Sequence, residues 1–353
     1  MNDFSQKHLL FLISQPRAGS TLTQRILGSH PDVYTTSEPW MMLHPLYALR
    51  EQGCYMEYSA DNSRRALHNF LSLHPQGEES YFRAVGQMYL NLYGAVLEPS
   101  QKRFFLDKTP RYYYIIPELY RTFPDAKYIF LLRNPLAILC SILSTFVQEN
   151  WWTIQYYQGD LLRAPGLIAQ GMLKLQDNSQ DNSMVLRYEA LLTHPEHEIQ
   201  RVCRFLDLPF NAEIIYYGEQ GAERWQFGDQ TLIHQESQPN AQNGDRWQQN
   251  LKDPIIWQSA HRYLELLGKD LLLRLGYAYD ELKDLLEARK PEVESILPPA
   301  LEDFFASASI FLDPSLQPPA VAASAPQFVH AYLKFGQDCL QKNRIELALD
   351  YLH

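Results

Sequence analysis

Short apolar runs alternate with amphipathic stretches along this chain. The run that begins at Leu9 and stops before Pro16 predicts a strand, and the apolar positions of 20–29 recur with the spacing of one helical face. Residues 30–39 are expected to form a loop, and 40–80 show no clear period. The same alternation predicts strands at 103–106, 127–132 and 184–186, and helices at 81–98, from Pro135 to about Phe146 and at 196–207. Strands that alternate with helices are typical of a mostly parallel α/β sheet flanked by helices.

The composition changes near the end of the chain. Residues 313–326 are rich in proline, alanine and serine, which is typical of a linker. We therefore expect a main α/β domain at 1–280, a helical extension at 281–312, a linker at 313–326 and a small all-α appendage at 327–353.

Size and charge limit the function classes. A chain of 353 residues with 46% hydrophobic content can bury a sizeable core. The formal net charge of −10 argues against a general nucleic-acid binder or a binder of anionic membranes, because such proteins carry basic faces. A bound polyanion must therefore meet a local basic pocket.

The cysteines and the apolar runs indicate where in the cell the protein is expected. The four cysteines, Cys54, Cys140, Cys203 and Cys339, show no CxxC or Cys/His spacing, which favours packed thiols over a disulfide framework or a zinc site. No apolar run is long enough for a signal segment or a membrane span. From these features we expect a cytoplasmic protein without a membrane span.

The polar segment between the first strand and the first helix carries candidate chemistry. A strand that enters a helix through such a turn leaves backbone N–H groups and the positive end of the helix dipole available to an anion. The segment is not a Walker A motif, because it has one glycine and no lysine before its hydroxyls. Strands 103–106 and 127–132 do not end in an acidic residue suited to magnesium, and Asp107 is followed at once by Lys108. A metal-dependent kinase is therefore disfavoured.

A second polar feature follows the strand at 127–132. Arg133 comes directly after this strand, and Ser141 lies about two turns along the next predicted helix. A guanidinium and a hydroxyl near one face can grip a second phosphate. Taken alone, the pair is more typical of a surface arginine and a helix serine.

Together, the segment Pro16–Thr21 and the later pair Arg133 and Ser141 resemble the sulfotransferase family, over roughly residues 8–280. The resemblance is greatest to tyrosylprotein sulfotransferases and related bacterial enzymes, which also carry arginine in the first loop where cytosolic enzymes have lysine. It implies a P-loop-like fold, PAPS (3′-phosphoadenosine 5′-phosphosulfate) as donor, PAP as product and no metal. It also implies that the 5′-phosphosulfate is bound by Arg17, Ala18, Gly19, Ser20 and Thr21, and the 3′-phosphate by Arg133 and Ser141.

The resemblance further assigns roles to single residues. Glu38 matches the catalytic base of the tyrosylprotein enzymes, and Lys108 matches a lysine on the leaving group. Tyr188 matches a tyrosine that contacts the cofactor, and Arg246 matches a late basic residue near the nucleotide. Cytosolic enzymes have a catalytic histidine where this chain has Pro110, which makes Glu38 the leading candidate for the base and His44 the second.

These residue types suit sulfuryl transfer, which depends mostly on positioning and electrostatic stabilisation. Arg17 and Lys108 would neutralise charge on the bridging oxygen, while Glu38 would remove the acceptor proton. The acceptor is a hydroxyl of a peptide, glycan, lipid or polyketide, and 40–80 and 147–180 are expected to shape its pocket. The aromatic residues of the second stretch more often pack than bind; they are Trp151, Trp152, Tyr156 and Tyr157.

The end of the chain and the alternatives complete the sequence-based expectations. Residues 329–353 resemble the opening of a tetratricopeptide repeat, with Tyr332, Gly336 and Ala348 in matching places, which implies a protein partner. An ordinary amphipathic hairpin is the alternative for this piece. For the whole chain, the alternatives to a sulfotransferase are a P-loop kinase-like phosphotransferase and an inactive nucleotide-binding scaffold.

Overall fold

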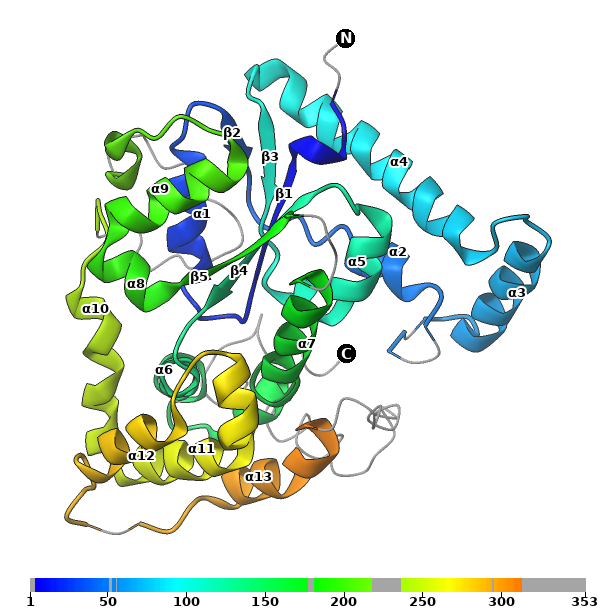
Figure 1. The fold of residues 1–353 in the computed structure, drawn as a ribbon. Helices are drawn as coiled ribbons and strands as arrows, with labels where there is room; N and C mark the ends of the chain where they lie inside the picture. Colours follow the sequence, from blue (N-terminus) through cyan, green and yellow to red (C-terminus); the bar gives the residue numbers. More distant parts are fainter. Residues whose placement is uncertain are drawn as a thin grey trace, which may run out of the picture.

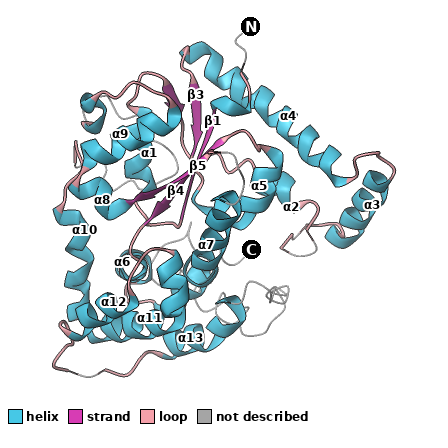
Figure 2. Cartoon of the chain, in the orientation of Figure 1, coloured by secondary structure: helices cyan, strands magenta, loops and turns pink. Residues whose placement is uncertain are grey.

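The computed structural model describes residues 4–50, 53–54, 56–176, 181–217, 236–293 and 295–312. At its centre is a five-stranded sheet, drawn in magenta in Figure 2. The strand order is β2-β3-β1-β4-β5, and every neighbouring pair is parallel. The strands are β1 (Leu9–Ser14), β2 (Val33–Thr35), β3 (Phe104–Asp107), β4 (Lys127–Leu132) and β5 (Ser183–Arg187). The parallel α/β sheet expected from the sequence is therefore confirmed.

Helices flank both faces of the sheet (Figure 1). One face packs against α1 (Ser20–Gly28), α8 (Tyr188–Thr193) and α9 (Pro195–Leu206), and the other against α4 (Glu78–Leu97), α5 (Ile116–Thr122) and α7 (Ala164–Gln176). The remaining described helices are α2 (Leu43–Tyr47), α3 (Ala60–Ser72), α6 (Pro135–Ile142), α10 (Gln242–Asp245), α11 (Pro254–Arg274), α12 (Tyr279–Glu287) and α13 (Pro299–Leu312).

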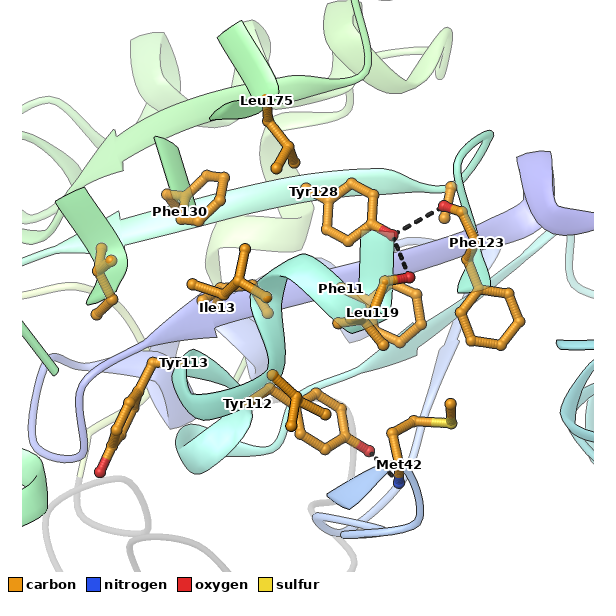
Figure 3. Packing of buried hydrophobic residues seen from close by; sticks show 14 of the residues in the cluster. Phe11, Ile13, Met42, Tyr112, Tyr113, Leu119, Phe123, Tyr128, Phe130 and Leu175 are labelled. Carbon is orange, nitrogen blue, oxygen red and sulfur yellow. Dashed lines mark hydrogen bonds between the residues drawn. The ribbon is translucent and has the colours of Figure 1, made fainter. Parts of the chain in front are cut away.

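The alternation of side chains along the strands divides the core between the two faces. In β1, Phe11 and Ile13 enter the cluster below α4, α5 and α7, whereas Leu10 and Leu12 enter the cluster below α1, α8 and α9. In the first cluster the buried Tyr128 hydroxyl donates to the carbonyls of Leu119 and Phe123, at 3.2 and 2.8 Å (Figure 3). A buried polar group needs such partners. Because both faces are covered, β1 and β4 are continuous apolar runs.

Some expected elements differ from those observed. Residues 30–39 were expected to form a loop, but they contain the short edge strand β2, which pairs with β3. The region 40–80 holds α2 and α3 although its sequence shows no clear period. The helix expected to run to about Phe146 ends as an α-helix at Ile142 and continues as a π-helical turn at Leu143–Val147. A three-residue strand and a five-residue helix are too short to establish a period.

The helical extension 281–312 packs on the main body. Leu301 and Phe304 of α13 join a cluster with residues of α6 and α11, and Arg262 of α11 pairs with Glu302 at 2.6 Å. The domain boundaries stay predictions, and the linker 313–326 and the repeat-like piece 327–353 lie outside the described residues.

The described cysteines are free thiols: Cys140 and Cys203 are buried and Cys54 is half-buried. Burial raises the pKa of the Cys140 thiol to about 12. Within the described parts of the chain, no helix has both the length and the apolar character required to cross a membrane.

Candidate active site

The predicted site residues follow the carboxyl ends of the strands. The loop after β1 holds Arg17, and Lys108, Arg133 and Tyr188 come directly after β3, β4 and β5. Glu38 lies a few residues beyond β2. Because the strands are parallel, these ends meet at one edge of the sheet, where α/β proteins bind their ligands.

The turn between β1 and α1 has an unusual backbone. Arg17 has a φ of 68° and Gly19 a φ of 91°, and both angles fall in the left-handed region. At Gly19 a side chain would also lack space, because a Cβ atom would lie 2.3 Å from the ring of Tyr188. Glycine thus lets the loop approach Tyr188 closely where it enters α1, whose first residues line the cleft.

Two residues that are distant from Arg17 in sequence contact it. Its Nε donates to the Ser141 hydroxyl at 3.1 Å, and Nη1 of Arg133 donates to the Arg17 carbonyl at 2.8 Å. The Arg133 guanidinium also lies 4.5 Å from the centre of the Tyr188 ring. Burial raises the pKa of this phenol, an effect that Arg133 partly opposes. Each of Arg133 and Ser141 thus contacts Arg17, and the expectation that the two bind one phosphate together stays a prediction.

Glu38 and Lys108 form a buried ion pair. Lys108 Nζ lies 2.5 Å from Glu38 Oε1, and the Lys108 side chain is 0% exposed. The other carboxylate oxygen of Glu38 accepts from the Trp40 indole at 3.1 Å. A lysine buried to this degree requires a counter-charge, and Glu38 supplies it. Both oxygens of Glu38 are thus held in place by a donor.

Neighbouring elements position the segment that carries Glu38. Gln24 of α1 donates to the Thr35 hydroxyl and to the Thr36 carbonyl, both at 2.7 Å. On the other side the Trp40 N–H donates to the Thr109 hydroxyl at 3.3 Å. The segment 36–40 is therefore fixed between α1 and the turn that follows β3.

The Asp107 carboxylate stabilises that turn through three hydrogen bonds. It accepts from Tyr93 at 2.6 Å, from Tyr112 at 3.0 Å and from Thr109 at 3.1 Å. Burial raises the pKa of Asp107 to about 6, although these hydrogen bonds and the charge of Lys108 act in the opposite direction. Asp107 is thus a structural carboxyl group beneath the site.

These residues surround one cleft of about 740 Å³, a size common for small-molecule sites. Nine of the predicted residues line it: Arg17, Gly19, Ser20, Thr21, Glu38, Arg133, Ser141, Tyr188 and Arg246. Ala18 is buried within the loop, and Lys108 lies behind Glu38. His44, the second candidate for the base, is exposed on α2 and is not among the lining residues. Among the described residues no group of three or more His, Cys, Asp or Glu could hold a metal.

Several lining residues had no individual role from the sequence, although Trp40, Tyr157 and Asp160 fall within the stretches 40–80 and 147–180 that were expected to shape the acceptor pocket. Trp40 and Arg111 come shortly after the predicted residues Glu38 and Lys108, so proximity in sequence was a usable signal. Tyr157, which the sequence predicts to be a packing residue, both packs and lines the cleft. Its ring stacks on that of Phe146 with the ring centres 5.4 Å apart. Asp160 lies in a π-helical turn at Gly159–Arg163, inside a stretch with no pattern that marks it.

The sequence of the chain is similar to those of known proteins. A family model described as "Sulfotransferase family" matches residues 10–212. The nodulation protein NoeE of Sinorhizobium fredii is 30% identical over 298 residues, which cover 76% of this chain and 66% of NoeE. The protein-tyrosine sulfotransferase of Drosophila melanogaster is 26% identical over 213 residues, which cover 60% of this chain and 40% of that enzyme. The chain thus spans less than two thirds of either relative.

A solved structure gives a further likeness. It is the mouse sulfotransferase SULT7A1 complexed with PAP, which aligns with a TM-score of 0.43 at 13% identity over 80% of this chain and 89% of that one.

Proposed function

The chain belongs to the sulfotransferase family, and on that premise we propose that it transfers the sulfuryl group of PAPS to a hydroxyl acceptor with Glu38 as general base. The observation that carries the proposal is the shared cleft. It is lined both by the turn before α1 and by Glu38, whose carboxylate is held by Lys108 and Trp40.

The donor would occupy the side of the cleft formed by the turn and the arginines. We call this side the donor half and define it by Arg17, Arg133, Tyr188, Glu236 and Arg246. Three guanidinium groups and the first N–H groups of α1 supply charge and hydrogen bonds for the phosphosulfate and the 3′-phosphate. The flat ring of Tyr188 and the indole of Trp247, which also line the cleft, offer contact area for the nucleotide.

The acceptor would occupy the side next to Glu38. We call this side the acceptor half and define it by Glu38, Trp40, Arg111 and Asp160. In this position the Glu38 carboxylate is available to a hydroxyl that enters from the cleft. The hydroxyl can belong to a peptide tyrosine, as the name of the Drosophila relative suggests, or to a glycan, lipid or polyketide.

The proposed step is an in-line displacement at sulfur. The acceptor oxygen attacks sulfur opposite the bridging oxygen, and the sulfur–oxygen bond to the 5′-phosphate breaks, with its electron pair remaining on PAP. The acceptor proton passes to the Glu38 carboxylate. Arg17, which lines the cleft, would neutralise the charge that grows on the bridging oxygen, which is the electrostatic part of the catalysis, and Lys108 would act through its ion pair with Glu38.

Binding and transfer measurements test this proposal directly. The protein is titrated calorimetrically with PAPS and, separately, with ATP and magnesium, and is then incubated with [³⁵S]PAPS and a cell extract. We expect PAPS to bind and label to appear in an acceptor. Tight magnesium-dependent ATP binding without any response to PAPS would contradict the proposal and favour a kinase-like phosphotransferase.

A further inference from the structure

The acceptor half of the cleft contains a second charge pair, between Arg111 and Asp160. Arg111 donates to both oxygens of the Asp160 carboxylate, from Nε at 3.2 Å and from Nη2 at 2.9 Å. Asp160 is only 1% exposed and also accepts from the Tyr113 hydroxyl at 2.5 Å. Its backbone carbonyl accepts from Gln15, at the start of the turn before α1, at 2.8 Å. The pair is thus a fixed part of the cleft wall.

The charges of this pair are compensated within the wall. Burial disfavours the charged form of Arg111, but the neighbouring Asp160 carboxylate outweighs burial and raises the pKa of Arg111. The Arg111 guanidinium also lies 5.6 Å from the centre of the Trp40 ring, so an aromatic ring covers one side of it. Two parallel hydrogen bonds of this bidentate kind fix the orientation of the guanidinium relative to the carboxylate.

The other charged pair of the acceptor half, Glu38 with Lys108, is compensated in the same way. Glu38 is paired with the buried Lys108 and hydrogen-bonded to Trp40. Among the described residues, every charged group of the acceptor half therefore has its opposite charge within the wall. The donor half differs, since Arg17, Arg133 and Arg246 face one carboxylate there, that of Glu236.

From this balance we propose that the acceptor is an uncharged hydroxyl compound, which binds against Trp40 and the exposed edge of Arg111. This inference rests on the proposed sulfotransferase activity. A charged acceptor would lose hydration on entering the cleft and would find its counter-charge already engaged, which costs free energy. An anionic acceptor would also be repelled by the donor. A neutral hydroxyl compound incurs neither cost and can accept hydrogen bonds from the remaining N–H groups of Arg111.

Separation of acceptors by charge before the reaction tests the inference. A cell extract is passed through an anion exchanger and then a cation exchanger, and all three fractions are incubated with the protein and [³⁵S]PAPS. We expect most of the label in the fraction that neither exchanger retains. Label mainly in a retained fraction would overturn the inference while leaving sulfuryl transfer intact. Absence of label from all fractions would instead contradict the proposed function itself.

Three variants test whether the preference for an uncharged acceptor depends on the Arg111–Asp160 pair. Asp160→Asn leaves the guanidinium uncompensated and should raise labelling of the fraction retained by the anion exchanger about ten-fold relative to the neutral fraction. Arg111→Gln leaves the carboxylate uncompensated and should favour the fraction retained by the cation exchanger. The double variant, which is again neutral, should return to the wild-type preference. Circular dichroism and PAP affinity monitor folding, and an unchanged preference in both folded single variants would contradict the role of the pair.

Discussion

The two halves of the cleft hold charge in different ways. In the donor half, Arg17, Arg133 and Arg246 line the cleft together with the first residues of α1. In the acceptor half, the charges occur as the pairs Glu38–Lys108 and Arg111–Asp160. An excess of positive charge suits a ligand that carries several negative charges, whereas internal pairing suits a ligand without charge.

The difference also concerns which part of the chain supplies the site. The donor half begins with a continuous turn, and its hydrogen bonds come partly from the backbone, so much of it depends on local conformation. The acceptor half depends on side chains from segments that are far apart in sequence, as with Arg111 and Asp160. Substitutions should therefore affect the two halves through different measured quantities.

The largest effect is expected in the acceptor half, at Glu38. Glu38→Gln removes the proposed base, and it also leaves the buried Lys108 without its counter-charge, so circular dichroism must first establish that the variant is folded. In the folded variant kcat should fall by about 10²–10⁴-fold. PAP affinity, which depends on the donor half, should stay near the wild-type value. Rates of [³⁵S] transfer and calorimetry with PAP measure the two quantities. Glu79→Gln, at an exposed position of α4, is the control, and undiminished turnover in Glu38→Gln would assign the base elsewhere.

The matching test of the donor half is Arg133→Ala. The variant loses a charged group that would contact the nucleotide, and charge-assisted hydrogen bonds of this kind contribute about 1.5–3 kcal/mol. PAP affinity should therefore fall by about 10–100-fold, while the KM for the acceptor changes little. Arg121→Ala, which removes an arginine paired with Glu79 outside the cleft, should leave PAP affinity unchanged. Equal PAP affinity in the two variants would contradict the role of Arg133.

A smaller effect is expected from the turn itself. Gly19→Ala places a Cβ atom against the Tyr188 ring at a left-handed backbone position, so the turn or the ring must shift. We expect weaker PAP binding and a free energy of unfolding lowered by about 1–3 kcal/mol. Gly244→Ala, at a helical position where the nearest atom is 3.7 Å away, is the control and should not destabilise the protein. Thermal melting and PAP titration measure both effects, and wild-type behaviour of Gly19→Ala would show that the close approach is unimportant.

The smallest effect concerns the support of the acceptor half and depends on pH. Because burial raises the pKa of Asp107 to about 6, the folded protein binds a proton there more tightly than the unfolded chain does. Between about pH 4 and pH 6 the contribution of Asp107 to stability therefore decreases as pH rises, and it is constant above that range. Asp107→Asn cannot ionise, so its melting temperature should rise relative to the wild type across this window. Melting curves from pH 4 to pH 7 test this, and a constant difference would show that Asp107 does not titrate there.

The sequence predicted the frame of the site well. The apolar runs at 127–132 and after Leu9 identified β4 and β1, and the segment before Ser20 identified the turn that enters α1. These features are local, since a buried strand and a tight turn each require particular residue types at adjacent positions. Helix α3 and the short elements β2 and α2 were missed. The formation of β2 and α2 depends on contacts with the rest of the fold.

The sequence by itself determined the parallel sheet, the turn between β1 and α1 and the identity of the charged residues near it. Only the tertiary structure decided which of these side chains contact one another. It brings Ser141 to Arg17, Lys108 to Glu38 and Asp160 to Arg111. Such pairs join segments that local patterns leave unrelated, because their meeting depends on how strands and helices pack over long sequence separations. The charge balance of the cleft, and with it the proposed preference for an acceptor, therefore depends on the packed protein.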